Sequence, residues 1–576
     1  MKENIYRNVY CGELSVNDVD KEVRVAGWVE QKRNLGSLVF ITLRDETGVV
    51  QLISEDIEKF KDLTRESTVT VTGTVRKRAD GMTNANMKTG EIEILISSFE
   101  ILGLAANVLP FEISRSTEAN EDTRLKYRYL DLRNPKIHNN ILLRSKVIDY
   151  IRTLMKDMNF TEISTPIIST SSPEGARDFV IPSRNFKGKF YALPQAPQIY
   201  KQLLMVSGFN RYFQIAPCFR DEDCRADRTL EFYQLDLEMS FVTEEDVFDV
   251  GETVFYETFK KFSDKEISPR PFKRISWKDA MAKYGSDKPD LRNPLIIEDI
   301  TDIFNKTEFN GFRDKTVKAI KVDNCDKPNS WFKKLEEFII DKGAKGLAYV
   351  KVADGELKST ITKFLSEKEI KDIQTRFNLK DGNVLFILAG DKPEKLCDLL
   401  RNKLGSELEL IDQNRFEFCI IYDFPMYEWN EEEKRWDFEH NPFNMPRGGL
   451  DALNGNPADV VANQYDFVCN GNEMASGAVR NHDVEIMKKA FAIAGYDEEV
   501  IKKKFRSLYT AFQYGAPPHA GMAPGIDRII MLLSGEENLR EVQVFPPNVS
   551  GADLLMGGPN ELDEKQLREL HIKIRD

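Results

Sequence analysis

Apolar and polar positions alternate in short runs between Lys21 and about Glu100. The runs are "KEVRVAGWVE", "SLVFITLRD", "GVVQLIS", "STVTVTGTVRKR" and "GEIEILISSFEI", and turn residues separate them. A period of two is typical of strands with one buried face. The pattern predicts a five-stranded barrel of the OB type, a fold that commonly binds single-stranded nucleic acid through aromatic and basic side chains. Phe40, Arg33 and Gln51 either lie on that binding face, or Phe40 is core and Arg33 is simply solvated.

A second region with a different period follows a linker from about Leu104 to Glu121. Apolar residues then recur at three- and four-residue spacing as far as Phe160, which predicts a helix. The next stretch, "TEISTPII", predicts a strand that Pro166 restricts to the edge or the end of a sheet. A second domain therefore starts here.

Opposite charges are concentrated in a hairpin from Cys218 to Phe241, "CFRDEDCRADRTLEFYQLDLEMSF". A period of two places Asp236 and Glu238 on one face of its second strand. The other face is apolar and consists of Tyr233, Leu235, Leu237, Met239 and Phe241. This pattern predicts one buried side, and the charged side is either exposed to solvent or a binding site.

The later stretch "GAPPHAGMAPGIDRIIMLLSG" favours a binding site. Gly521, Ala523 and Gly525 alternate, so one face of the predicted strand has almost no side chains and lets a flat ligand lie close. Arg528 follows in the first turn of a helix, where the macrodipole disfavours a cation, and this placement indicates an anionic ligand. Arg220 and Arg528 would together suit phosphate oxygens.

Bulk composition limits the class of protein. A chain of 576 residues is too long to fold around one hydrophobic core, so two to four domains are expected. A hydrophobic share of 41%, a charged share of 30% and the lack of a long apolar run predict a soluble globular protein without a membrane span. The start, "MKENIYRNVYCGEL", has no signal or transit features, so a cytoplasmic location is expected.

Charge and cysteine content exclude two further classes. The seven cysteines form no C-x-x-C pair, which argues against a zinc site and a disulfide framework. A net charge of -13 excludes a broadly basic coat for nucleic acid but permits a local basic groove.

Several long motifs are similar to those of a known enzyme family. "FTEISTP", "FRDEDCRADRTLEF" and "GMAPGIDR" resemble, in this order, motifs 1, 2 and 3 of class II aminoacyl-tRNA synthetases. "SPEGARDF", "ALPQAPQIYKQLLMVSGFNRYFQIAPCFRDED" and "YGSDKPDLR" resemble aspartyl-tRNA synthetases of the bacterial type. The resemblance covers nearly the whole chain.

The resemblance implies an α+β multidomain architecture. An OB-fold anticodon-binding domain would span 1–105 and a hinge 106–125. The catalytic domain, an antiparallel sheet flanked by helices, would span 126–288 and 413–576, interrupted by a GAD-type insertion at 289–412 that "GAKGLAYVKV" identifies. Motif 1 implies a homodimer, and the tail "NELDEKQLRELHIKIRD" predicts a helix packed on the catalytic domain.

The implied activity is that of an aspartate–tRNA ligase. L-aspartate reacts with ATP to form aspartyl-adenylate and pyrophosphate, and the aspartyl group then passes to the 3′ end of tRNA(Asp). The α-carboxylate is already ionised and needs no general base, so arginines and Mg²⁺ suffice. The implied ATP-binding residues are Arg220, Asp221, Glu222, Arg228, Phe232, Glu473, Gly525, Ile526, Asp527 and Arg528. Arg220, Arg528, Glu222 and Glu473 would be catalytic, and the two glutamates would hold Mg²⁺ with ATP.

The resemblance also implies an aspartate pocket. Lys201 and Arg480 would bind the side-chain carboxylate, and Glu174, Gln198 and Asp236 the ammonium group, with His440 on a segment that senses bound substrate. Asparagine would leave the two cations short of an anion, a penalty of roughly 2–4 kcal/mol. In the barrel, Phe40 would stack on the middle anticodon base, and Arg33, Gln51 and Glu93 would contact bases around it.

Departures from the family pattern and alternative functions remain. "NGNEMASGAVRNHD" lacks the triple glycine that many members have, and Glu439 precedes His440 where two histidines are common. Neither departure removes an expected charged catalytic group, so full activity is predicted. The alternatives are an asparagine-charging relative and a catalytically inactive tRNA-binding paralogue, and the sequence does not decide whether tRNA(Asn) is also charged.

Overall fold

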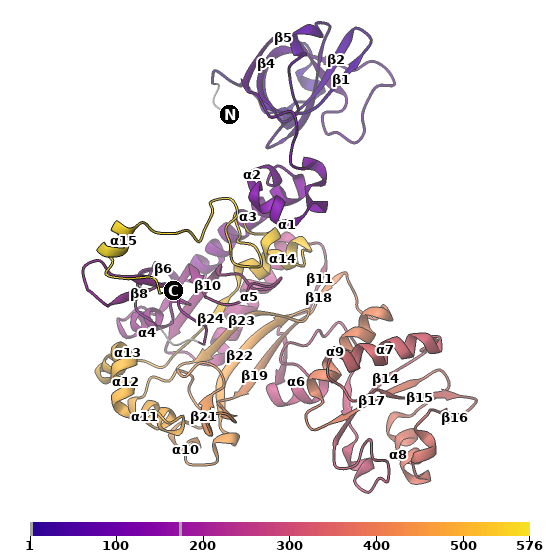
Figure 1. Cartoon of the computed structure of the whole chain (residues 1–576), viewed down its shortest axis with the longest axis vertical. Coiled ribbons are helices and arrows are strands. Elements are labelled where there is room, and N and C mark those ends of the chain that lie inside the picture. The colour runs from indigo at the N-terminus through magenta and orange to yellow at the C-terminus, as the bar shows by residue number, and fades with distance from the viewer. Residues whose placement is uncertain (1–3, 172–174, 576) are drawn as a thin grey trace. The chain divides into compact units, whose positions relative to one another are not determined.

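The computed structural model of the chain describes residues 4–171 and 175–575. Two compact units follow each other along the chain, Met1–Ser116 and Thr117–Asp576 (Figure 1). Within the described ranges, none of the helices has both the length and the apolar character needed to cross a lipid bilayer.

The first unit contains a closed five-stranded barrel, as the alternating pattern predicted. Its strand order is β1-β2-β3-β5-β4. The strands are β1 (Glu22–Leu35), β2 (Leu38–Asp45), β3 (Gly48–Ser54), β4 (Thr68–Lys77) and β5 (Ile92–Gly103). Alternate apolar residues such as Val25, Ile41 and Val71 fill the interior with no exposed surface.

The second unit is built around an eight-stranded sheet of order β12-β19-β22-β23-β24-β10-β9-β6. In that order the strands span Lys273–Ser276, Phe418–Pro425, Val461–Cys469, Asn472–Val479, His519–Pro524, Glu231–Ser240, Arg211–Phe219 and Thr161–Glu162. The paired strands are antiparallel except for β12 with β19 and β6 with β9. The predicted α+β architecture with an antiparallel catalytic sheet is confirmed.

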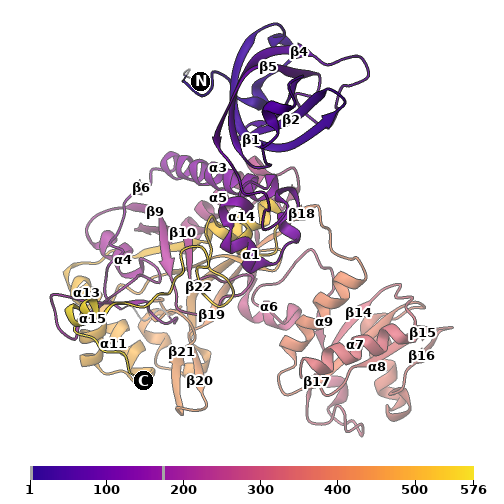
Figure 2. The same ribbon diagram turned by 45° about the horizontal axis from the view of Figure 1, so that its top comes forward.

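One face of this sheet is covered by helices (Figure 2). Leu235, Leu237 and Met239 of β10 are fully buried there, against side chains from α3 (Pro135–Asp157), α5 (Glu244–Phe262) and α14 (Ile526–Ser534). The predicted burial of the apolar side of the hairpin is therefore confirmed for these three residues. Phe241 is an exception: β10 ends at Ser240, and Phe241 has a φ of 59° and is 73% exposed.

The second unit also contains shorter helices. They are α1 (Glu121–Lys126), α2 (Arg128–Asp131), α4 (Gln198–Val206), α10 (Gly449–Ala452), α11 (Val484–Ile493), α12 (Glu498–Lys504), α13 (Arg506–Ala511) and α15 (Glu564–Glu569). The strand predicted for "TEISTPII" is only the two-residue β6, at the sheet edge. The tail forms the predicted helix as the short α15, in which Leu567 is half-buried and no residue is fully buried, and its packing on the catalytic domain stays a prediction.

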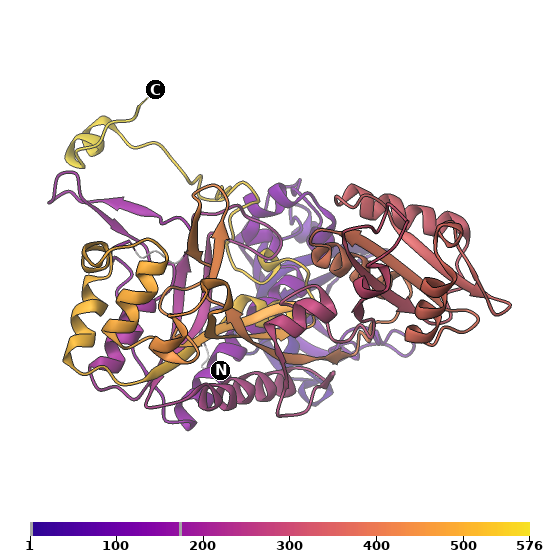
Figure 3. The same cartoon turned by 90° about the horizontal axis from the view of Figure 1, so that it is seen from below.

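A second α+β fold is inserted between β12 and β19, after α6 (Trp277–Tyr284) (Figure 3). Its sheet has the order β13-β14-β17-β15-β16, with strands Ile297–Asp299, Thr316–Val322, Val384–Gly390, Ala348–Ala353 and Glu356–Lys358. Helices α7 (Asn329–Asp341) and α9 (Glu394–Glu407) pack on one core of this fold and α8 (Glu367–Phe377) on another.

The two ends of the insertion are held together. Arg292 donates from Nη1 to the carbonyl of Asp412 (3.5 Å). Arg401, which is fully buried, donates to the carbonyls of Asp290 (2.9 Å), Asn293 (2.7 Å) and Leu295 (2.7 Å). The chain therefore leaves the catalytic sheet and returns to it at one place.

Candidate active site and nucleic-acid face

A cavity of about 620 Å³ lies over the polar face of the eight-stranded sheet. Its walls include Gln198, Lys201, Arg220, Glu222, Arg228, Phe232, Asp236, His440, Glu473, Arg480, Gly525, Asp527 and Arg528. Most of the predicted ATP and aspartate residues therefore surround one space. In particular, Arg220 and Arg528 line the same cavity.

Three predicted site residues are not part of the described wall. Glu174 lies outside the described residues. Ile526 is fully buried in the core on the helix-covered face, because it begins α14 on the side that packs against the sheet. The backbone N–H of Asp221 donates to the carbonyl oxygen of Arg177 (3.0 Å), and the half-exposed Asp221 carboxylate lies 3.9 Å from the Arg177 guanidinium.

The hairpin presents Arg220 to the cavity at the end of β9. The Arg220 guanidinium lies 4.9 Å from the centre of the Phe232 ring, on the neighbouring strand. Its Nε is buried and has no hydrogen-bond partner among the described residues. Because a buried donor of a charged group is costly to leave unpaired, this nitrogen indicates an acceptor supplied by a ligand. Arg228 lies further along the hairpin and donates to Glu222 (3.2 Å).

Glu473 is the centre of the opposite wall. Lys288 contacts its Oε2 at 2.8 Å, and Arg528 donates to its carbonyl at 2.6 Å. Burial would raise the pKa of Glu473, but Lys288 and then Arg528 hold it below its usual value. Burial and the neighbouring Glu473 raise the pKa of Asp466 well above its usual value. Sequence reasoning assigned no role to Lys288 or Asp466, although Lys288 lies in the quoted "YGSDKPDLR".

Asp527, predicted to bind ATP, already has protein partners. Arg144 donates to its Oδ1 (2.5 Å), and the backbone N–H of Tyr233 donates to its Oδ2 (2.8 Å). These contacts attach α14 to α3 and β10. Asp527 therefore positions the helix that carries Arg528.

Three buried charges, Lys201, Asp236 and Arg480, form the floor of the cavity, and a fourth, Glu238, contacts the two cations from outside its lining. Lys201 lies 2.7 Å from Asp236 and 3.4 Å from Glu238, and Arg480 donates from Nε to Glu238 (3.0 Å). Burial alone would raise the pKa of Glu238, but Arg480 and Lys201 lower it. The argument that asparagine would leave two cations short of an anion therefore needs correction, because both cations already have carboxylate partners.

Glu238 was not among the predicted site residues, although its alternation with Asp236 placed it on the charged face. It also explains Gly521. A Cβ at position 521 would lie 2.2 Å from Glu238 Oε2 and 2.1 Å from the Leu237 carbonyl, so no side chain fits. The absence of a side chain at Gly521 leaves room for Glu238 rather than for a flat ligand, whereas Ala523 and Gly525 do line the cavity.

The cavity wall carries further polar groups. Gln198 Nε2 and Asn444 Oδ1 are buried and have no hydrogen-bond partner in the described part of the chain. The ring of His440 is exposed and meets Phe424 edge-on at 5.5 Å. The unpaired amide groups can bind a ligand that carries both donors and acceptors.

Glu439 beside this histidine gives the cavity a pH-dependent charge. Burial, with Glu428 and Asp287 nearby, raises the pKa of Glu439 to about 7. The native state therefore binds this proton more tightly than the unfolded state, and stability is lost as the pH rises from the unfolded pKa through about 7. We expect Glu439→Gln to stabilise the protein by about 1–2 kcal/mol more at about pH 8 than at about pH 5, as measured by urea unfolding.

The control for this prediction is Glu432→Gln, at an exposed position nearby. It should leave the difference between the two pH values unchanged. An equal effect of Glu439→Gln at both pH values would contradict the assigned titration.

The predicted nucleic-acid residues of the barrel are on neighbouring strands. Arg33 of β1 and Phe40 of β2 are cross-strand partners, and Arg33 is exposed. Gln51 Nε2 donates to Glu93 Oε2 (2.7 Å), and Arg76, which sequence reasoning missed, donates to Glu93 Oε1 (2.8 Å). The Glu93 carboxylate is therefore held in one orientation on this face.

Comparison with known proteins identifies the family of the chain. The family described as "tRNA synthetases class II (D, K and N)" matches residues 120–549, and an "OB-fold nucleic acid binding domain" matches residues 23–102. A protein from Rickettsia bellii named "Aspartate--tRNA(Asp/Asn) ligase" is 51% identical over 99% of this chain and 98% of its own length. The chain belongs to the class II aspartate–tRNA ligases.

Other relatives of this class II ligase share its length and its fold. "Aspartate--tRNA ligase" from Streptomyces coelicolor is 51% identical over 99% of both chains. A putative aspartyl-tRNA synthetase structure from Leishmania major has a TM-score of 0.60 at 21% identity and covers 94% of each chain. Asparaginyl-tRNA synthetase from Pyrococcus horikoshii has a TM-score of 0.59 at 19% identity, covering 94% of this chain and 98% of its own. At such low identity these two structures support the fold alone.

Proposed function

We propose that the chain activates L-aspartate with ATP, releasing pyrophosphate, and transfers the aspartyl group to the 3′ end of tRNA(Asp). This proposal rests on one observation: Arg220 and Arg528 line the same cavity as Lys201, Asp236 and Arg480, which form its floor. Cations at one end suit a triphosphate, and buried charges of both signs at the other suit the ammonium and carboxylate groups of an amino acid.

In this proposal, the reaction needs alignment and charge stabilisation rather than proton transfer. The aspartate α-carboxylate attacks the α-phosphate, whose oxygens take charge in the transition state. Arg220 donates to those oxygens through the nitrogen that lacks a protein partner. Arg228 and Arg528 bind the far end of the triphosphate, and Phe232 stacks on adenine.

Glu473 and Glu222 are proposed to hold Mg²⁺ that arrives with ATP. Among the described residues no three carboxylate, histidine or cysteine groups form a metal cluster. This donor set fits Mg²⁺, which commonly takes one or two carboxylates and completes its shell with phosphate oxygens and water. Bound Mg²⁺ would supply charge neutralisation for the phosphates. The Lys288 ammonium lies 2.8 Å from Glu473 Oε2, so Mg²⁺ would use the other carboxylate oxygen or displace this lysine.

The remaining partners are also proposals. Lys201 and Arg480 bind the aspartate side chain, while Gln198, Asp236, His440 and Glu174 contact the rest of the amino acid. Arg33, Phe40, Gln51 and Glu93 contact the anticodon. A homodimer through motif 1, a GAD-type identity for 289–412 and a cytoplasmic location complete the proposal.

The decisive experiment is aspartate-dependent ATP–pyrophosphate exchange by the full-length chain. We expect exchange with aspartate and much slower exchange with asparagine. Absence of exchange with both amino acids would favour a tRNA-binding protein without catalysis, and a preference for asparagine would favour an asparagine-charging relative.

Charging of tRNA(Asn) is a second candidate activity. The relatives of equal identity carry different names, one with Asp/Asn and one with Asp alone. Purified tRNA(Asp) and tRNA(Asn) charged in parallel would separate the two activities.

A further inference from the structure

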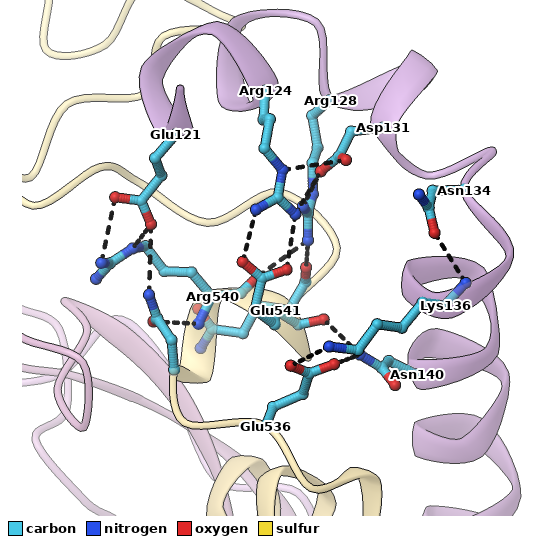
Figure 4. A network of polar contacts seen from close by, with 12 residues as sticks. Glu121, Arg124, Arg128, Asp131, Asn134, Lys136, Asn140, Glu536, Arg540 and Glu541 are labelled. Atoms are coloured by element: carbon cyan, nitrogen blue, oxygen red, sulfur yellow. Dashed lines mark hydrogen bonds and ion pairs between the residues drawn. The ribbon is translucent and has the colours of Figure 1, made fainter. Parts of the chain in front are cut away.

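Residues 538–544, here called the bridging segment, follow α14 and include the short helix η9 (Leu539–Glu541). On one side they contact the hairpin loop between β9 and β10, which carries Arg220 and Arg228. On the other side they contact α1 and α2 at the beginning of the second unit (Figure 4). None of the motifs or candidate site residues described above lies in this segment.

Two residues of the bridging segment hold the tip of the hairpin loop. The backbone N–H of Leu539 donates to the carbonyl of Ala226 (2.9 Å), and Arg540 Nη1 donates to the carbonyl of Arg225 (3.1 Å). Arg225 and Arg228 pair through their backbones, at 2.9 Å and 3.4 Å, and close the tip. A shift of the Arg225 carbonyl would therefore move Arg228, whose side chain lines the cavity.

Gln543 holds the other arm of the same loop. Its Nε2 is within hydrogen-bond distance of Thr229 Oγ1 (3.2 Å), the Glu231 carbonyl (3.1 Å) and Asp527 Oδ1 (3.4 Å). The bridging segment thus contacts both arms of the loop and the helix that carries Arg528.

Arg540 connects this loop to α1. Its Nε and Nη2 donate to the two carboxylate oxygens of Glu121, at 2.7 Å and 3.4 Å, and its side chain is 6% exposed. A guanidinium is planar and rigid, so a carboxylate that occupies two of its nitrogens also sets the direction of the third. Glu121 therefore determines where Nη1 points, and Nη1 holds Arg225.

We propose that Arg540 is a positioning residue for the ATP-binding loop and that Glu121 fixes its orientation. The inference rests on the proposed function, because it assigns ATP to the cavity. Its consequence is that α1, at the start of the second unit, controls the affinity of the cavity for ATP but not for aspartate. The aspartate floor is formed by Lys201, Asp236 and Arg480, which lie on other elements.

The short helix η9, which contains Arg540, also provides a matched control. Glu541, the next residue after Arg540, accepts from both terminal nitrogens of Arg124 (2.8 and 2.7 Å). Figure 4 shows this second ion pair beside the first. Among the described residues, the contacts of Glu541 are to α1 and α3, through Arg124 and Asn140, and not to the hairpin loop. Glu541→Gln therefore breaks a similar ion pair without releasing the loop.

The test compares Glu121→Gln, Arg540→Gln and Glu541→Gln in the full chain. For each variant, ATP affinity is measured by calorimetry without aspartate, the KM values for ATP and aspartate by pyrophosphate exchange, and the Tm by thermal unfolding. Glu121→Gln and Arg540→Gln should raise the Kd and KM for ATP about tenfold, with the KM for aspartate within about twofold of wild type. Glu541→Gln should lower the Tm and leave the KM for ATP within about twofold.

Two results would overturn the inference: an unchanged Kd for ATP in Glu121→Gln, or an equal rise in Glu541→Gln. Glu121 is partly exposed, so its variant tests the inference even where Arg540→Gln does not fold. Failure of the proposed function gives a different result, the absence of aspartate-dependent exchange in the wild-type chain.

Discussion

Arg220→Gln is expected to slow aspartate-dependent ATP–pyrophosphate exchange by about 100- to 1,000-fold, the loss found when one donor to a transition-state oxyanion is removed. The Nε of Arg220 has no hydrogen-bond partner among the described residues, and the guanidinium's contact with the Phe232 ring at 4.9 Å contributes only about 0.5–1 kcal/mol to stability. The Tm should therefore remain close to that of wild type. Rates measured at saturating ATP and aspartate would separate the loss of kcat from any change in KM.

Arg211→Gln is the matched control. Arg211 begins the same strand, and its guanidinium also lies over a phenylalanine ring, that of Phe160, at 5.4 Å. It donates to the carbonyl of Met158 and does not line the cavity. Its variant should retain exchange activity. A similar loss in both variants, or an active Arg220→Gln, would contradict the proposed role of Arg220.

Glu238→Gln is expected to lower the free energy of unfolding by about 3–5 kcal/mol, because it leaves Arg480 and Lys201 with one carboxylate between them in a buried site. Both Glu238 oxygens are involved, with Arg480 Nε on Oε1 at 3.0 Å and Lys201 on Oε2 at 3.4 Å. The two cations should lose their fixed positions. The KM for aspartate should then rise at least about tenfold, while the KM for ATP changes less.

Glu252→Ala separates general destabilisation from the site effect. Glu252 is a buried carboxylate of α5 that accepts from the backbone N–H of Phe272 (3.1 Å), away from the cavity. The alanine variant leaves this N–H without its acceptor and removes buried side-chain atoms, so it should lower stability without changing the KM for aspartate. Urea unfolding and exchange kinetics on both variants provide the comparison. An unchanged KM for aspartate in Glu238→Gln would exclude Glu238 as a positioning residue for Lys201 and Arg480.

Alternation along single strands was the most reliable signal in the sequence. It predicted the barrel and the buried side of β10, because each inward position of a half-buried strand must be apolar. It failed at Phe241, since it does not mark the residue at which a strand ends.

The site was only partly predictable because charged partners are far apart along the chain. Alternation put Glu238 beside Asp236, but its partner Arg480 is 242 residues away, and nothing local indicates that the two meet. Arg540 and Glu121 are likewise separated by 419 residues. Local placement already singled out Arg220 and Arg528, but Lys201 and Arg480 came only from motif resemblance, which carries information about three-dimensional contacts that composition and periodicity lack.

The hydrogen bond between Arg292 and the carbonyl of Asp412 indicates where the insertion of this enzyme can be replaced by another segment. Because the insertion starts and ends at one point, its length adds little to the entropy of closing the surrounding chain. A fluorescent reporter or a shorter loop placed between these two positions would therefore leave the neighbouring parallel strands in register, and this junction is suited to domain replacement.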